Sequence, residues 1–214
     1  MTTQTRVPIL VHSLLAPLRR EIAPYARQVL VIVPACVVFA ILTAPDSPLL
    51  VRVAVGVTAA AGATAAVIDW HTFRLPDAVV VPGMVLTMAA LALAQLIRLA
   101  GLAEPALLEP ESSGRFLPAL LGAAALGSGW ALLWVLGRGH LGFGDVKLAV
   151  LLGLTSGWFD WSTVWWTGAL PLLFAGTFAL MLLATRRAER TTPFPLGPWM
   201  LLGWLSALVA TGTV

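Results

Sequence analysis

The sequence predicts an all-α, polytopic membrane helix bundle of about seven spans (six to eight), with a cytoplasmic N-terminus. Hydrophobic residues make up 59% of the 214 residues and charged residues only 11%, whereas an average soluble domain carries about 25% charged residues. The mean hydropathy is +0.91. The long aliphatic runs lack the period-two alternation of barrel strands, so helices are expected rather than an outer-membrane barrel.

Seven apolar runs define the expected spans, since a helix needs roughly 20 residues to cross about 30 Å of hydrocarbon. They cover residues 28–44, 50–69, 78–99, 116–137, 145–158, 162–184 and 196–213. The fifth run begins at Asp145 and has few apolar residues, which predicts a short, tilted helix. Residues 28–214 are therefore expected to form one membrane-embedded domain.

Residues 1–27 are expected to form a separate N-terminal arm. The arm contains an apolar run, VPILVHSLLAPL, but Arg19, Arg20 and Glu21 follow the run and a small-residue cleavage site does not. A cleaved signal peptide is therefore not expected. A cytoplasmic or interfacial arm fits this pattern better.

The basic residues predict the orientation, because cytoplasmic segments are enriched in lysine and arginine. With the N-terminus inside, only Arg52, Arg98 and Arg115 of the 13 basic residues fall on the outer side. The cytoplasmic basic residues are Arg6, Arg19, Arg20, Arg27, Arg74, Arg138, Lys147, Arg186, Arg187 and Arg190. Asp69 and Asp145 then lie near the same, cytoplasmic face.

Composition excludes several other classes of protein. The pI is about 10.0, but the basic residues are too sparse and scattered for a nucleic-acid-binding face. The one cysteine, Cys36, lies in an apolar run, which excludes disulfide frameworks and CxxC metal or redox sites. Cys36 is expected to be a small, buried, apolar side chain.

Two aspartates at the ends of apolar runs are the best candidates for a functional site. Asp69 ends the run before WHTFRLPD, and Asp145 begins the run DVKLAVLLG. Either one alone fits a water-facing helix end equally well, but ionisable residues at the edge of a span mark a site by default. Two close carboxylates do not both ionise easily, so one keeps a proton while the other is charged. Such a pair supplies a general base for water and a general acid for a leaving amine.

The residues around Asp145 suit a crevice that admits an extended peptide. Gly142 and Gly144, on either side of Phe143, allow a tight turn and the close approach of another backbone. Lys147 is the only lysine in the chain. It is expected to be a charge partner for the site or an anchor at the lipid headgroups.

The remaining polar residues near the aspartates are given structural interpretations. Pro76 is expected to set a turn, and Asp77 to be the N-cap of the third span. His71 and His140, with two aspartates, could hold a divalent ion, but we interpret them as interfacial side chains near anionic lipid. No metal and no cofactor is therefore expected.

Three stretches carry a resemblance to a known family. In the first, Ile68–Asp77, a Pro-Asp pair follows Asp69 by seven residues. The second is GFGDVKL at residues 142–148, and the third and weakest is PFPLGP at residues 193–198. From about residue 30 to the C-terminus, the sequence resembles the type IV prepilin peptidase family, the bacterial GxGD aspartic peptidases. The third stretch resembles the PFGP element of that family, interrupted by Pro-Leu.

The resemblance implies that Asp69 and Asp145 are the catalytic pair of an aspartic endopeptidase. The motif and substrate-channel residues that it implies are Gly142, Phe143, Gly144, Lys147, Pro76 and Asp77. The implied partner is the basic leader and apolar N-terminal helix of a prepilin or pseudopilin, cut at the cytoplasmic face of the bacterial inner membrane. Membrane lipid is the other expected partner, and nucleic acid is not one.

Two departures from the family pattern limit what it implies. Larger members carry a cytoplasmic domain with paired CxxC motifs, associated with N-methylation of the new amino terminus. A chain with the single cysteine Cys36 resembles a short, peptidase-only form, so methyltransferase activity and a zinc site are in doubt. Arg138 and His140 stand where members often carry an acidic residue before the GxGD motif.

Other functions could use the same two aspartates. A small proton- or cation-coupled transporter is the main alternative, although transporters usually place such carboxylates near the bilayer midplane. A peptidase of the signal-peptide-peptidase type is disfavoured, because Ile68 stands where that type has tyrosine. An inactive scaffold in a secretion or pilus assembly complex is the third alternative.

Overall fold

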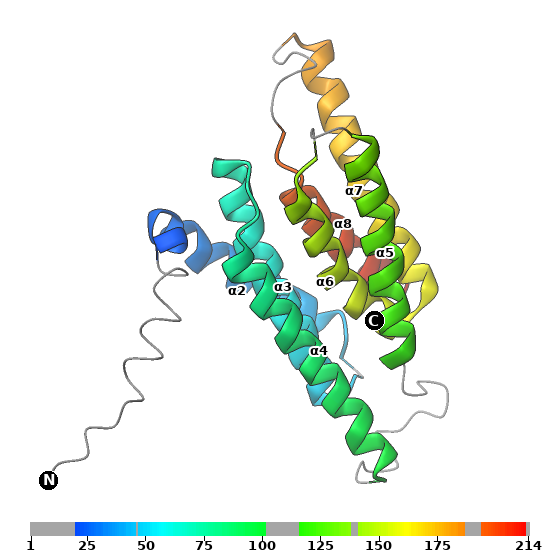
Figure 1. Ribbon diagram of the computed structural model, residues 1–214. Helices are drawn as coiled ribbons and strands as arrows, with labels where there is room; N and C mark the ends of the chain where they lie inside the picture. The colour runs from blue at the N-terminus through cyan, green and yellow to red at the C-terminus, as the bar shows by residue number, and fades with distance from the viewer. Residues whose placement is uncertain (1–19, 46, 102–115, 138–140, 187–193, 213–214) are drawn as a thin grey trace, which may run out of the picture.

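The computed structural model describes residues 20–45, 47–101, 116–137, 141–186 and 194–212, and within these ranges the regular secondary structure is all helical (Figure 1). After the 3-10 turn η1 (Ala23–Tyr25), seven α-helices follow in order. They are α2 (Ala26–Leu42), α3 (Leu49–Thr72), α4 (Asp77–Leu99), α5 (Phe116–Leu136), α6 (Phe143–Phe159), α7 (Trp161–Ala184) and α8 (Gly197–Ala210). The described residues thus confirm the predicted all-α bundle of about seven spans.

Five of the helical stretches are long and apolar enough to cross a membrane. These are Arg20–Leu42, which runs into α2, together with α3, α4, α5 and α7. At about 1.5 Å per residue, the 17 residues of α6 give a short helix, as the sequence predicts. The 14 residues of α8 give a second short one. Helical structure begins at Arg20, so residues 20–27 of the expected arm are helical, and residues 1–19 lie outside the described part.

Helices α3 and α6 occupy the centre of the bundle. Helix α3 packs against α2, α4, α6 and α8, and α6 packs against α3, α4, α5, α7 and α8. In Figure 1, α6 lies between the α3–α4 pair and α5. In its most apolar stretch, 78% of α3 is buried, against 6% of the first helix. The two aspartates therefore belong to the helices with the most protein around them.

Small residues allow the closest helix contact, between α5 and α6. A Cβ on Gly122 would lie 2.7 Å from the carbonyl oxygen of Gly153 and 2.8 Å from the Cα of Gly157. Neither position on α6 has room for a larger side chain, because a Cβ on Gly153 would lie 2.7 Å from the Cα of Ala123. Lipid tails are as apolar as the helix surfaces, so membrane helices associate through close packing, which small residues at the interface permit.

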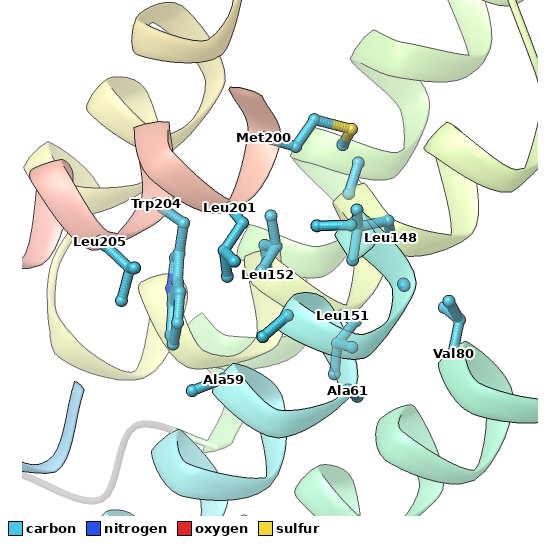
Figure 2. Packing of buried hydrophobic residues seen from close by; sticks show 14 of the residues in the cluster. Ala59, Ala61, Val80, Leu148, Leu151, Leu152, Met200, Leu201, Trp204 and Leu205 are labelled. Atoms are coloured by element: carbon cyan, nitrogen blue, oxygen red, sulfur yellow. The ribbon is translucent and has the colours of Figure 1, made fainter. Parts of the chain in front are cut away.

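A buried apolar cluster joins the central helices deeper in the bundle than the two aspartates. Figure 2 shows Leu148, Leu151 and Leu152 of α6 among side chains from α3, α4 and α8. The labelled partners are Ala59, Ala61, Val80, Met200, Leu201, Trp204 and Leu205. Each of the three leucines is at most 1% exposed. This packing fixes α6 between α3 and α8, and with it the end of α6 that carries Asp145.

The helix ends near the aspartates differ from the predicted boundaries. Helix α3 continues three residues past Asp69, to Thr72, so Asp69 lies within its last turn. Helix α6 begins at Phe143, so Asp145 is its third residue rather than its first. The predicted N-cap, Asp77, is wrong by one residue: Pro76 is the N-cap of α4 and Asp77 is the first helical residue. The reason is that the Pro76 carbonyl accepts from the amides of both Val79 and Val80, each at 3.1 Å, and the Asp77 carboxylate binds elsewhere.

Candidate active site

A pocket of about 510 Å³ lies at one end of the bundle. Three segments line it: the end of α3 with the turn into α4, the start of α6, and the residues before α8. Its lining residues are Asp69, Phe73, Arg74, Leu75, Asp77, Leu141, Gly142, Phe143, Gly144, Asp145, Lys147, Phe194 and Leu196. We call this the aspartate pocket. All the site residues predicted from the sequence line it except Pro76, which is buried at the start of α4.

Asp69 is held by the start of a distant helix. Its side chain is 4% exposed, and its Oδ2 accepts a hydrogen bond of 2.8 Å from the amide of Gly197, the first residue of α8. Free amides and the helix dipole make a helix N-terminus a favourable partner for a carboxylate. A Cβ on Gly197 would lie only 3.1 Å from that same oxygen, so glycine permits this approach.

Asp145 is held by the start of its own helix. It is 7% exposed, and its Oδ2 accepts from the amide of Gly142 at 3.2 Å, while its own amide donates to the Gly142 carbonyl at 3.1 Å. The reciprocal pair satisfies groups that a helix N-terminus otherwise leaves unpaired. The GxGD sequence therefore orients its own aspartate.

Gly144 brings the two aspartate-bearing segments together. A Cβ on Gly144 would lie 2.7 Å from the Cβ of Leu75, in the turn that follows α3. The contact places the start of α6 against that turn, and Asp69 and Asp145 line one pocket. The close approach expected at Gly144 is thus made by the chain itself, whereas a Cβ on Gly142 would have no neighbour closer than 3.6 Å.

Lys147 pairs with Asp77 and not with either of the two buried aspartates. Its Nζ lies 2.7 Å from both carboxylate oxygens of Asp77, and 5.4 Å from the centre of the Phe143 ring. The side chains are 28% and 63% exposed for Lys147 and Asp77. The ion pair joins the fifth residue of α6 to the first residue of α4, at the rim of the aspartate pocket.

Sequence reasoning missed part of the pocket wall. Phe73, Arg74 and Leu75 line it from the turn after α3, and Phe194 and Leu196 from the segment before α8. Arg74 and Leu75 lie between two predicted site residues, and the PFPLGP stretch was noted only as a weak similarity. That stretch could have been assigned to the site, because glycine and proline before an apolar run indicate a helix start that can bind an anion.

His71 does not line the aspartate pocket. His71 is exposed on α3, where its ring stacks on Tyr25 at 4.7 Å and its Nε2 lies 2.7 Å from Oε1 of Gln28. His140 lies outside the described residues, as do Arg138 and Pro193. Among the residues that the structure describes, no group of three or more His, Cys, Asp or Glu side chains could hold a metal ion.

Comparison with known proteins gives one family match and several relatives. The profile described as the type IV leader peptidase family matches residues 56–185. A prepilin leader peptidase/N-methyltransferase of Pseudomonas aeruginosa is 33% identical over 84 residues, covering 37% of this chain and 28% of the relative. A protein of the same name from Stutzerimonas stutzeri is 32% identical over 95 residues, covering 42% and 31%. One from Pseudomonas putida is 29% identical over 148 residues, covering 66% and 44%.

The matches with these relatives are partial. The chain matches less than half the length of each. No solved structure gives a significant match. The matched segment of the family profile contains both Asp69 and Asp145.

Proposed function

Because this chain belongs to the type IV leader peptidase family, we propose that it is an aspartic endopeptidase that removes the leader peptide of prepilins or pseudopilins, with Asp69 and Asp145 as its catalytic pair. The observation that carries the proposal is the placement of two buried carboxylates, from the two central helices, in one pocket at the end of the bundle. It is a multi-pass membrane protein. We propose that the site faces the cytoplasm, because the distribution of lysine and arginine along the sequence favours that orientation.

The chemistry follows from one proton shared by two carboxyl groups. Two carboxyl groups that act on one peptide bond do not both ionise easily, so in this proposal one is a carboxylate and the other a carboxylic acid. The carboxylate takes a proton from water as the water oxygen attacks the peptide carbonyl carbon. The acid gives its proton to the peptide nitrogen as the C–N bond breaks. The products are a new carboxyl end and a new amine, and the pair exchanges roles before the next cycle.

The position of the pocket supports cleavage of a chain that leaves the membrane. Asp69 lies in the last turn of α3 and Asp145 in the first turn of α6, so the site is at helix ends and not at mid-bundle. A leader peptide must be extended to expose its peptide bond, and it can reach such a site from water. A transporter site is expected near the bilayer midplane instead.

The test is co-expression with a precursor that carries a basic leader and an apolar N-terminal helix. Asp69→Asn and Asp145→Asn should each lower the cleavage rate by about 10²–10⁴-fold, the usual contribution of a general acid or base. Cleavage is followed by the mobility shift of the precursor, and insertion of each variant by its amount in the membrane fraction. Full activity in either variant would rule out the two-carboxylate mechanism.

A matched control makes the same chemical change outside the pocket. Asp160 follows α6 at its other end and caps α7, where its Oδ2 accepts from the Ser162 amide at 3.1 Å. Asn is an equally good N-cap, so Asp160→Asn should cleave at the wild-type rate. A loss there equal to that in Asp145→Asn would mean that bundle folding, and not chemistry, is being measured. Ion-dependent uptake without cleavage would indicate the transporter instead.

A further inference from the structure

A second hollow lies beside the aspartate pocket and opens to the side of the bundle. It has a volume of about 420 Å³, with α3 as its floor and α2 and α8 as its walls. Helix α2 contributes Gln28, Ile32 and Cys36, one residue per turn, and α8 contributes Leu201, Leu202 and Leu205 among others. We call this the lateral groove. Its lining is almost entirely apolar, and the lining residues repeat every three to four positions because each set lies on one face of its own helix.

The lateral groove and the aspartate pocket are lined by different residues from the same two regions, the end of α3 and the start of α8 with the segment before it. Ala66, Val67 and Trp70 line the groove from α3, on either side of Asp69 in the sequence. Pro198 lines it from α8, next to the glycine whose amide binds Asp69. The Asp69–Gly197 contact therefore lies next to residues that line the groove as well as those that line the aspartate pocket.

The polarity of the groove changes along its length. Its polar end holds Gln28 and His71, whose side chains bind each other at 2.7 Å, at the same end of α3 as Asp69. Cys36 lies eight residues further along α2, or about 12 Å deeper. An occupant that matches this gradient has a polar end beside the aspartates and an apolar body that extends into the membrane.

We infer that the lateral groove holds the apolar N-terminal helix of the precursor while its leader lies in the aspartate pocket. This inference rests on the proposed function and assigns a place to the part of the substrate that is not cut. A lipid chain could fill the apolar part, but only a ligand that is apolar in one part and peptide in the next fills both spaces. Helix-in-groove recognition by residues spaced three and four apart is a common mode of peptide binding.

The single cysteine offers a direct test, because it lies within the groove and the chain has no other. The protein carrying Asp145→Asn is co-expressed with precursors that have one cysteine at successive positions of the apolar helix, and a mild oxidant is added. Disulfides to Cys36 are expected at precursor positions three or four residues apart, on one face of the helix. Two thiols held side by side have an effective concentration of about mM, so the expected yield is about tenfold above that of the control.

The control moves the thiol by two residues on the same helix. Val38 is 56% exposed and does not line the groove, so Cys36→Ser/Val38→Cys presents a thiol to lipid at nearly the same depth. Equal cross-linking from both positions would mean random contact in the bilayer and would overturn the inference. Dimers joined through Cys36 that persist when precursor is present would also overturn it, since the groove would then bind a second copy of this chain.

A second variant measures the consequence for cleavage. Leu202 is 48% exposed in the groove wall, so Leu202→Trp should insert without disturbing the core and should reduce the space for a helix. The KM for precursor is expected to rise about tenfold, equivalent to about 1.4 kcal/mol, with kcat little changed. Val38→Trp should change neither, and an unchanged KM in Leu202→Trp would contradict the inference.

The failure of the groove and the failure of the enzymatic proposal are distinguishable. A precursor that the wild type cuts, but that does not cross-link preferentially to Cys36, rules out the groove and leaves the peptidase in place. A precursor that cross-links at Cys36 but is never cut by the wild type rules out the peptidase and keeps the groove as a helix-binding site.

Discussion

The two aspartates sit in one pocket but are positioned in different ways. Asp145 is held by Gly142, three residues before it in the same motif, so its orientation is a local property of the start of α6. Asp69 is held by Gly197, 128 residues further along the chain. Its orientation therefore depends on the docking of α8 against α3, which is a property of the whole bundle.

Asp145 is thus positioned by local structure, whereas Asp69 is positioned by tertiary structure. A change that moves α8 should act on Asp69 while leaving the hydrogen bond between Gly142 and Asp145 intact. Changes at the start of α6 should act on Asp145 and on the contact with the turn after α3. Substitutions of glycine test this directly, because a single added methyl group reports how closely the neighbouring atoms approach.

Among the glycine substitutions, the largest loss of cleavage rate is expected for Gly197→Ala. The added Cβ would meet Asp69 Oδ2 at 3.1 Å, and both Asp69 Cβ and Leu75 Cδ2 at 3.3 Å, so either the carboxylate or the start of α8 must move. Contacts of 3.1–3.3 Å require a shift of a few tenths of an ångström, and a displacement of about 1 Å at a reacting group can cost about 10²-fold in rate, so we expect precursor cleavage to fall by about tenfold to 10²-fold. Membrane insertion should be normal, because the rest of α8 remains packed.

Gly142→Ala is the matched comparison. A Cβ there meets its nearest neighbour, Asp145 Oδ2, at 3.6 Å, which is ordinary contact, and the backbone φ of −76° suits any residue. The cleavage rate should remain within about threefold of wild type, in line with the small effects of substitutions that create no clash. Equal losses at Gly142 and Gly197 would contradict the distinction between local and tertiary positioning.

An intermediate effect is expected for Gly144→Ala, which acts on the contact between the two segments. Its Cβ would lie 2.7 Å from the Leu75 Cβ, and overpacking of this kind costs about 1–3 kcal/mol. We expect a lower temperature of unfolding in detergent and a cleavage rate reduced by about tenfold, because α6 must shift away from the turn after α3. Gly176→Ala on α7, where nothing lies within 4 Å, should lower neither quantity.

A double variant sharpens this prediction. Leu75→Gly removes the atom that the new methyl group meets, so Gly144→Ala/Leu75→Gly should cleave faster than Gly144→Ala alone. The two substitutions should therefore be non-additive, as expected for residues in direct contact. Additive losses would mean that Gly144 acts through something other than its contact with Leu75.

The contrast between the aspartates also explains what the sequence could predict. The helices were predictable because the apolar runs are continuous and most of them are long, and the hydrogen bond of Asp145 because its partner Gly142 is a neighbour in the chain. The hydrogen bond from the Gly197 amide to Asp69 was not predictable, because no local pattern indicates which distant helix start will contact Asp69. The same holds for the partner of Lys147, since its contact with Asp77 spans 70 residues.

The predicted N-cap of α4 was wrong because another residue already provides the group that the helix start requires. Asp77 is a good N-cap residue by type, but Pro76 already provides the carbonyl that α4 needs, so the carboxylate is available for Lys147.

The lateral groove was not predicted at all. Its walls come from three helices that only the packing brings together, and each contributes side chains that look like ordinary lipid-facing residues.

The smallest effect is expected for the ion pair at the rim. Asp77 is 63% exposed and Lys147 28%, and exposed ion pairs typically contribute about 0–1 kcal/mol. Asp77→Asn and Lys147→Gln should each slow cleavage by no more than about fivefold, because the pair steadies the start of α6 without touching the carboxyl groups that react. The reversed pair, Asp77→Lys/Lys147→Asp, should recover most of the wild-type rate, and a double-mutant cycle on the cleavage rate measures the coupling. A loss for Lys147→Gln far larger than for Asp77→Asn would instead assign Lys147 a direct role towards Asp145 or the substrate, since a residue that acts only through its partner cannot matter more than the pair.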